Sequence, residues 1–323
     1  MIDTRNIEDM KLHVNNATKF YETKSGPLHA LDNFSMDVTE GQFVSVVGPS
    51  GCGKTTLLWS MAGLHSLSSG EIRLGEEIVK EPHPQIGMVF QDANLLPWRN
   101  LINNIQLPFE IKGIKPDDAR IKNLLERVGL AGFGQKYPRE LSGGMQQRAA
   151  IVRALSFDPS VLLMDEPFGA LDAFTRDDMN LLVQEIWLET QKTIVFITHD
   201  LDEALRIGDR IAILRDGTIV QTGSPQDIIL NPADDYVTDF TKNINRGRVL
   251  QVAAIMDDET PETGPKIERN MVIEDALQVL SKAEATTAIV THNAKPVGSV
   301  DLNTIIAALT RPDDGSGRTG SYT

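Results

Sequence analysis

Short apolar runs alternate with helix-like stretches along the first part of the chain. QFVSVVG precedes KTTLLWSMAGL, VLLMDEP precedes AFTRDDMNLLVQEIWLETQ, TIVFITH precedes DLDEALRIG, and RIAILRDG ends the series. Strands that alternate with helices in this rhythm are typical of a largely parallel sheet with helices on both faces. The pattern therefore predicts an α/β domain, which we place at residues 1–242.

Residues 94–155 have a different pattern, rich in helix. In DDARIKNLLERVGL the apolar side chains recur at helical spacing and share one face: Ile121, Leu124, Leu125 and Val128. The segment predicts a helical insertion into the α/β domain.

The pattern changes again after about residue 242. Residues 243–267 are irregular and acidic through MDDETPETGPK, which predicts a linker. Residues 268–310 predict a small α+β unit with a helix in IEDALQVL, strands in TAIVTH and PVGSV, and a helix in DLNTIIAAL. The apolar helical faces are Ile273, Ala276, Leu277 and Leu280, and then Leu302, Ile305, Ile306 and Leu309. Residues 311–323 are polar and glycine-rich, which predicts a disordered tail.

Composition narrows the class of protein. The length of 323 residues favours two domains, and no apolar run approaches the roughly 18 residues of a membrane-spanning helix. The amino terminus, MIDTRNIEDMKLHV, lacks the pattern of a secretory signal, so we expect a cytosolic protein. A single cysteine, Cys52, permits no internal disulfide. The net charge of −14 argues against nucleic acid as a partner.

GPSGCGKTT follows a predicted strand and opens a predicted helix. It fits G-x-x-x-x-G-K-[ST], a phosphate-binding pattern in this context. Backbone N–H groups of such a loop face phosphate oxygens, Lys54 neutralises the β and γ phosphates, and the Thr55 hydroxyl can ligate magnesium. The candidate nucleotide-binding residues of the loop are Gly48, Pro49, Ser50, Gly51, Cys52, Gly53, Lys54, Thr55 and Thr56. The alternative is a flexible turn.

Two further strand ends carry candidate chemistry. VLLMDEP delivers Asp165, which could hold magnesium through water, and Glu166, which could polarise the water that attacks the γ phosphate. Two acids after a strand also suit an ordinary helix start. TIVFITHD supplies His199, either as a contact to the γ phosphate or as a structural histidine.

LSGGMQQR, from Leu141 to Arg148, places two adjacent glycines before an amphipathic helix. This looks like a second anion site, and because one loop already holds the phosphates, it predicts that a second chain uses it. The phosphate loop, Gln91 in VFQD, LSGGMQQR, LLMDEP, GALD and His199 occur in the order found in ATP-binding subunits of ABC transporters. The chain resembles that family over residues 10 to about 240.

The resemblance implies a head-to-tail dimer with two ATP molecules and Mg²⁺ at its interface. It implies Glu166, His199 and Gln91 as catalytic residues, and Thr55, Gln91 and Asp165 as the metal-binding residues. The opposite subunit would supply Ser142, Gly143 and Gly144, with Gln147 and Asp172 also counted among the nucleotide-binding residues, and Asp172 coupling the two sites. Tyr21, in KFY ahead of the first strand pair, matches the aromatic that stacks on adenine, and Phe20 is its competitor.

Two segments bear on transport. Leu95, Leu96 and Trp98 could be core of the insertion or an apolar patch that docks a membrane partner. That stretch resembles importers for nitrate, sulfonate and taurine. NRGRVL, AAIM and the unit that follows instead resemble one CBS motif, as in glycine betaine importers.

The sequence thus predicts the ATPase subunit of an importer. It would sit at the cytoplasmic face of the cell membrane on separate permease subunits, which receive a small solute from a binding protein. The single CBS-like unit would regulate it. The alternatives are import of a quaternary amine such as glycine betaine, a non-transport ABC ATPase, and a regulatory nucleotide-binding module without turnover.

Overall fold

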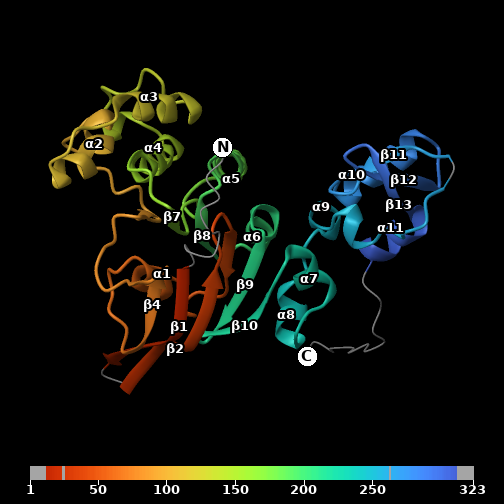
Figure 1. The fold of residues 1–323 in the computed structure, drawn as a ribbon, viewed down its shortest axis with the longest axis horizontal. Helices are drawn as coiled ribbons and strands as arrows, with labels where there is room; N and C mark the ends of the chain where they lie inside the picture. The colour runs from red at the N-terminus through yellow and green to blue at the C-terminus, as the bar shows by residue number, and fades with distance from the viewer. Residues whose placement is uncertain (1–11, 24–25, 262, 311–323) are drawn as a thin grey trace, which may run out of the picture. The chain divides into compact units, whose positions relative to one another are not determined.

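The computed structural model describes residues 12–23, 26–261 and 263–310, and its chain forms two compact units, Met1–Ser224 and Pro225–Thr323. Figure 1 shows the elements of both units in chain order. The sequence pattern predicts a boundary near residue 242, whereas contacts divide the chain after Ser224. The tail predicted at 311–323 lies outside the described residues.

A six-stranded sheet forms the centre of the first unit, in the order β10-β9-β3-β8-β7-β6. Its strands are β3 (Phe43–Val47), β6 (Ile86–Val89), β7 (Val161–Asp165), β8 (Thr193–Thr198), β9 (Arg210–Arg215) and β10 (Thr218–Gly223). All neighbours are parallel except β9 and β10. Every residue of β3, β7 and β8 is buried, as expected for apolar strands covered on both faces. The predicted α/β fold is confirmed.

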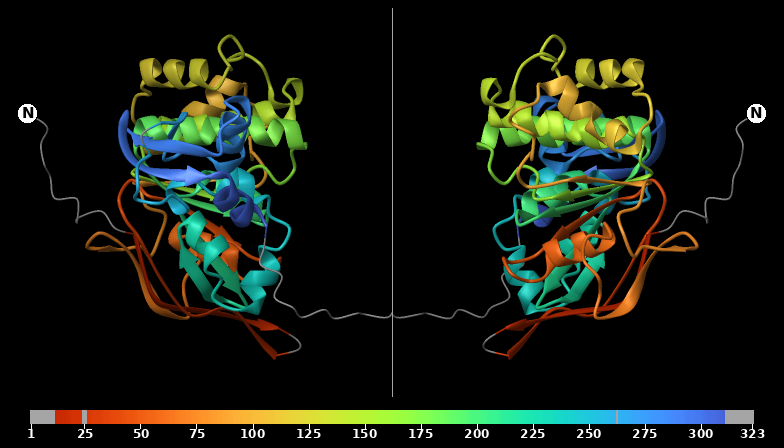
Figure 2. Two further views of the ribbon diagram at one scale, coloured as in Figure 1. Left: turned by 90° about the vertical axis from the view of Figure 1, so that its right-hand side faces the viewer. Right: turned by 90° about the vertical axis from the view of Figure 1, so that its left-hand side faces the viewer.

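A second, antiparallel sheet, in the order β2-β1-β4-β5, is absent from the sequence prediction. It contains β1 (Leu12–Thr23), β2 (Gly26–Val38), β4 (Ser69–Leu74) and β5 (Glu77–Ile78), and β1 and β2 are the long red strands of Figures 1 and 2. Register shifts break the pairing of β1 with β2, and Asn16 and Asn33 have positive φ angles. These irregularities interrupt the alternation that identifies a strand in sequence. Tyr21 therefore lies within the strand pair and not ahead of it.

Helix α1 (Lys54–Met61) packs in the core shared by the two sheets. Its Leu57, Leu58 and Met61 belong to one buried cluster with Val14 of β1 and Val46 of β3. The loop ahead of α1 is thereby held between both sheets.

The helical segment packs on the central sheet in a shared core that includes Phe43 of β3 and Phe196 of β8. It comprises α2 (Leu101–Lys112), α3 (Asp118–Arg127), η1 (Pro138–Glu140) and α4 (Gly143–Ser156), followed after β7 by α5 (Ala173–Thr190) and after β8 by α6 (Leu201–Ile207). The predicted apolar face of α3 is buried. Leu95 packs against this core, whereas Trp98 is 71% exposed. No helix among the described residues is both long and apolar enough to cross a membrane.

The second unit is larger than the sequence predicts. It contains α7 (Pro225–Leu230), α8 (Asp235–Phe240), α9 (Arg246–Val249), η2 (Val252–Ala254), β11 (Lys266–Glu268), α10 (Ile273–Lys282), β12 (Thr287–His292), β13 (Lys295–Asp301) and α11 (Leu302–Leu309). Much of the predicted linker packs here: Val249, Leu250 and Val252 are buried, and the Val252 N–H donates to the Met271 carbonyl. On α11, Ile306 is 46% exposed and departs from the predicted buried face.

A buried carboxyl in α6 generates a stability prediction. Glu203 is buried, and its Oε1 has no hydrogen-bond partner among the described residues. Burial raises the pKa of this carboxyl, while hydrogen bonds from Thr198 and Asn180 oppose the rise. A carboxyl whose folded pKa lies above its unfolded pKa destabilises the protein above that folded pKa, and the penalty vanishes below the unfolded pKa.

We therefore expect Glu203→Gln to increase the free energy of unfolding by about 1 kcal/mol at pH 8. The gain should shrink as the pH is lowered toward 5. Urea unfolding at both pH values measures it, with the exposed Glu185→Gln as control. An effect of equal size at both pH values would contradict this account.

Candidate active site

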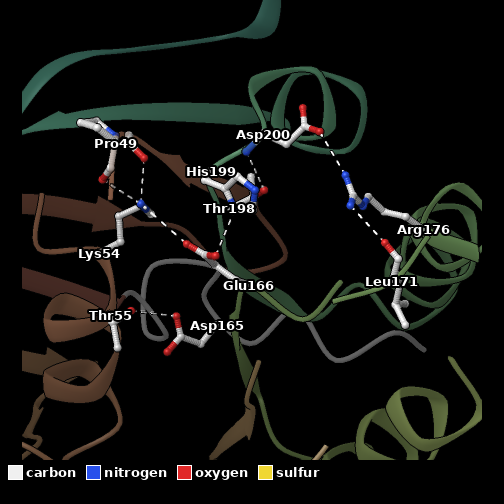
Figure 3. Close-up of polar contacts among 11 residues, drawn as sticks. Pro49, Lys54, Thr55, Asp165, Glu166, Leu171, Arg176, Thr198, His199 and Asp200 are labelled. Atoms are coloured by element: carbon white, nitrogen blue, oxygen red, sulfur yellow. Dashed lines mark hydrogen bonds and ion pairs between the residues drawn. The ribbon is translucent and has the colours of Figure 1, made fainter. Parts of the chain in front are cut away.

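The loop between β3 and α1 is shaped around a lysine. Lys54 is 5% exposed; its Nζ donates to the carbonyls of Gly48 (2.7 Å) and Pro49 (3.1 Å) and lies 3.7 Å from Glu166 Oε1 (Figure 3). A side chain on Gly53 (φ 103°) would bring its Cβ within 2.1 Å of the Ala30 carbonyl oxygen. Only glycine allows the loop to curl so closely against β2.

A candidate magnesium site lies where α1 meets the end of β7. Thr55 Oγ1 donates to Asp165 Oδ1 (3.2 Å), and Trp59 Nε1 donates to Asp165 Oδ2 (3.0 Å). Burial raises the pKa of the Asp165 carboxyl, and the two hydrogen bonds counteract that rise. A hydroxyl and a carboxylate suit a small hard cation that keeps part of its water. The described residues contain no cluster of three His, Cys, Asp or Glu side chains for a metal.

Glu166 lies close to three other residues that the sequence predicts for the site: Lys54, His199 and Gln91. Its Oε2 lies 3.0 Å from His199 Nδ1, and its Oε1 faces Lys54. Gln91 belongs to the same corner, because a Cβ built on Gly169 would lie 3.7 Å from Gln91 Nε2 and 3.8 Å from Glu166 Oε2. Glu166 has a positive φ of 42°, an uncommon conformation for glutamate that turns the chain at the strand end. Its carboxylate is suited to accept a proton from water.

The cavity beside the loop has a volume of about 330 Å³. It is lined by Tyr21, Leu28, His29, Ala30, Ser50, Gly51, Gly53, Lys54, Thr55, Thr56 and Glu166. Phe20 is absent from this lining and its ring instead lies 6.1 Å from that of His29. Of the two aromatic candidates, Tyr21 is therefore the one at the cavity. Cys52, buried within the loop with its thiol pKa raised by burial, contributes packing.

The LSGGMQQR and GALD motifs meet at two helix starts. Ser142 Oγ accepts from the Met145 N–H, and Asp172 accepts from the Thr175 N–H (3.0 Å) and hydroxyl (2.7 Å). The Thr175 bonds lower the pKa of Asp172. A Cβ on Gly144 would lie 2.7 Å from Thr175 Cγ2, so any other residue there requires the threonine to shift. Ser142 and Gly143 are exposed and lie outside the described lining of the cavity.

Gln147 has a different position from the one its motif suggests. It is 3% exposed, and its Nε2 donates to the carbonyls of Phe90 (3.0 Å), Gln91 (2.9 Å) and Pro167 (2.6 Å). The side chain therefore braces the Gln91 segment against the segment after Glu166. In this structure Gln147 is an internal support and does not line the cavity.

Comparison with known proteins agrees with this geometry. Residues 31–169 match the family model described as ABC transporter. The trimethylamine N-oxide transport system ATP-binding protein TmoW of Pelagibacter ubique is 40% identical over 297 residues, covering 87% of this chain and 86% of that protein. The chain belongs to the ABC transporter family.

Other members of the family align over different shares of the chain. The glycine betaine transport ATP-binding protein OpuAA of Bacillus subtilis is 35% identical over 86% of this chain and 71% of its own. The aliphatic sulfonates import ATP-binding protein SsuB of Bacillus thuringiensis is 43% identical over 64% of this chain and 81% of its own. The solved dimeric structure of the bacterial ABC transporter cassette MJ0796 has a TM-score of 0.60 and 34% identity, covering 66% of this chain and 98% of that one.

As an ABC transporter cassette, the chain is an ATPase and its nucleotide is ATP. The structure brings the predicted Lys54, Thr55, Asp165, Glu166 and His199 to one end of the parallel sheet. The sequence prediction overlooked Trp59, although its spacing of four residues from Thr55 puts both side chains on one face of α1.

Proposed function

We propose that this chain hydrolyses Mg–ATP as one half of a head-to-tail dimer and energises a separate permease that imports a small methylated amine. The observation that carries the ATPase part is the position of Glu166, whose carboxylate lies between Lys54 Nζ and His199 Nδ1 at the phosphate loop. A base at this point faces the γ-phosphate end of a nucleotide bound by the loop.

Each side chain of the site has a distinct role. Lys54 exchanges its loop carbonyls for β- and γ-phosphate oxygens, and Thr55 with Asp165 and Gln91 holds the metal. Mg²⁺, when bound, neutralises charge on the transferring phosphoryl group. Glu166 orients the attacking water and accepts its proton, and His199 contacts the γ phosphate.

A second copy completes the site. Ser142 and Gly143 lie at an exposed helix start outside the cavity of their own chain, where their N–H groups are available to an anion. The dimeric structure of the related MJ0796 cassette supports a dimer of this chain. In the proposed dimer, this helix start covers the partner's nucleotide. Asp172 then lies on a neighbouring helix start and connects the two sites. Tyr21 stacks on adenine.

Glu166→Gln should retain ATP binding but reduce phosphate release by about 10²–10⁴-fold, because it removes the base and keeps the shape of the side chain. The ATP-bound dimer should then accumulate in size-exclusion chromatography with Mg–ATP. Adding Ser142→Arg should abolish that dimer and leave nucleotide binding to the monomer intact. Hydrolysis near the wild-type rate in Glu166→Gln would place the base elsewhere.

The permease docks on the helical segment. Trp98 is 71% exposed there, and Ile111 of α2 is 77% exposed beside a groove of about 520 Å³ that Met88, Leu107 and Phe157 also line. Exposed apolar side chains around a groove are typical of a protein contact. Docking puts the chain at the cytoplasmic face of the cell membrane. A non-transport ABC ATPase gives these side chains no partner.

The extent of the alignments supports a methylated amine as the solute. Relatives named for trimethylamine N-oxide and glycine betaine align over 72–87% of the chain, and the alignments over 85–87% are long enough to include part of the second unit. The sulfonate relatives align over 64%. These lengths favour a methylated amine as the solute. They argue against the sulfonates, nitrate and taurine of the importers that the stretch around Leu95, Leu96 and Trp98 resembles.

The solute is tested with the chain reconstituted in liposomes together with its permease and a solute-binding protein. Trimethylamine N-oxide or glycine betaine should stimulate ATP hydrolysis several-fold, and taurine or nitrate should not. Trp98→Ser should abolish the stimulation and keep the basal rate. Stimulation by taurine alone would assign the transporter to sulfonates.

The second unit is a single CBS-like regulator that pairs with the same unit of the partner. It contains a three-stranded sheet in the order β11-β12-β13, and Ile306 exposes on α11 an apolar side chain that a second copy covers. Pairing around the two-fold axis of the dimer biases the ATPase domains between open and closed arrangements.

In the reconstituted transporter, ending the chain after Ser224 should remove the dependence of ATPase activity on ionic strength. Ile306→Glu in the full chain should weaken that dependence through loss of pairing, and Asn303→Glu, exposed on the same helix, should not. If the truncated and full chains respond to salt alike, the unit is a stabilising appendage.

A further inference from the structure

The Asp165 carboxylate is held at both oxygens by donors from one helix. Thr55 Oγ1 reaches Oδ1 and the indole Nε1 of Trp59 reaches Oδ2. Residues four apart on a helix lie one above the other, so both donors approach from the same face of α1. The two contacts fix the plane of a side chain that is otherwise free to rotate about its last torsion.

The two donors differ in what else they can do. A hydroxyl both donates and accepts, so Thr55 can turn its lone pairs toward a cation when one is bound. An indole N–H only donates, and it cannot ligate a metal. Trp59 therefore keeps Oδ2 occupied, while the Oδ1 edge, beside Thr55, is the one left for the ion.

Two further aromatic side chains, His65 and Tyr21, support Trp59. Its ring lies 4.9 Å from that of His65 at an interplanar angle of 72°, an edge-to-face contact. His65 Nδ1 lies 3.1 Å from Tyr21 Oη, and Tyr21 lines the cavity. Three contacts thus join Tyr21 to Asp165 through the two intervening rings.

We propose that Trp59 is a positioning residue that orients the Asp165 carboxylate for the metal of Mg–ATP, and that His65 and Tyr21 hold Trp59 in place. The inference rests on the proposed role of Asp165 as a metal ligand and adds a residue that the phosphate-loop pattern does not contain. These contacts connect Tyr21, at the adenine end of the cavity, to Asp165 at the metal end.

The test compares two tryptophans that make similar bonds in different places. Trp59→Phe keeps an aromatic ring and removes the donor to Oδ2. Trp187→Phe is the matched control, because its Nε1 donates to the Gly41 carbonyl (2.8 Å) away from the cavity. Electron paramagnetic resonance measures Mn²⁺ binding to the full chain with a non-hydrolysable ATP analogue, and nucleotide affinity is measured separately in EDTA.

We expect Trp59→Phe to weaken Mn²⁺ binding about tenfold, the size of one hydrogen bond to a charged group. Nucleotide affinity in EDTA should stay within about twofold of wild type, because the phosphate loop itself is unchanged. Trp187→Phe should change neither quantity. His65→Leu, which keeps the indole donor and removes its support, should weaken Mn²⁺ binding in the same direction by a smaller factor.

Two results would overturn the inference. If Trp59→Phe leaves Mn²⁺ affinity unchanged, Trp59 contributes only packing. If nucleotide affinity in EDTA falls as much as Mn²⁺ affinity, the substitution disrupts the phosphate loop and not the metal site alone. Asp165→Asn separates the metal site from the positioning role. If it too leaves Mn²⁺ binding unchanged, the proposed metal site is wrong; if only Trp59→Phe is without effect, the positioning role alone fails.

A second measurement does not depend on how well Trp59→Phe folds. The chain has three tryptophans, so Trp98→Phe with Trp187→Phe leaves Trp59 as the sole indole fluorophore. Paramagnetic Mn²⁺ with the ATP analogue should quench its emission, and diamagnetic Mg²⁺ should not. Absence of quenching would remove Trp59 from the metal site.

Discussion

The positions of the phosphate loop and of the end of β7 depend on one buried ammonium group. Lys54 is 5% exposed, and burying a charge costs several kcal/mol unless it is paired and hydrogen-bonded. The carbonyls of Gly48 and Pro49 and the carboxylate of Glu166 meet that requirement. The loop must therefore curl inward, and β7 must end where the next residue, Glu166, faces the lysine. The nucleotide site is the arrangement that satisfies this charge.

The parallel sheet meets these conditions through its strand order. Strands β3, β8 and β7 are neighbours and parallel, so their carboxyl ends open on one edge, where ligands bind in such sheets. This places Lys54, His199 and Glu166 together, although the chain between them is long. Gln147 and Trp59 then fix the approach of Gln91 and Asp165 from behind. The candidate chemistry lies at the strand ends, and two side chains outside the cavity lining hydrogen-bond to the segments that carry it.

The second unit shows that composition alone does not predict whether a segment is structured. The stretch around Val249 and Val252 precedes an acidic run, and its composition predicts a linker, yet the backbones of Val252 and Ala253 bond to Met271 and Arg269. Met271 and Arg269 lie more than 15 residues after Val252 and Ala253 in sequence, so no local pattern indicates these bonds. The strands of the antiparallel sheet escaped prediction for a related reason. Their alternation is broken at Asn16 and Asn33, and only pairing between strands identifies them.

The sequence by itself determined the α/β fold, the phosphate loop and the family, because buried strands are continuous apolar runs and the motifs follow strand ends in a fixed order. The tertiary structure decided which side chains meet: it buried Gln147 against the Phe90, Gln91 and Pro167 carbonyls, lined the cavity with Tyr21 and not with its competitor Phe20, and joined Trp59 to Asp165. Burial and hydrogen bonding depend on residues brought together from distant parts of the chain, and spacing along one strand or helix does not record them.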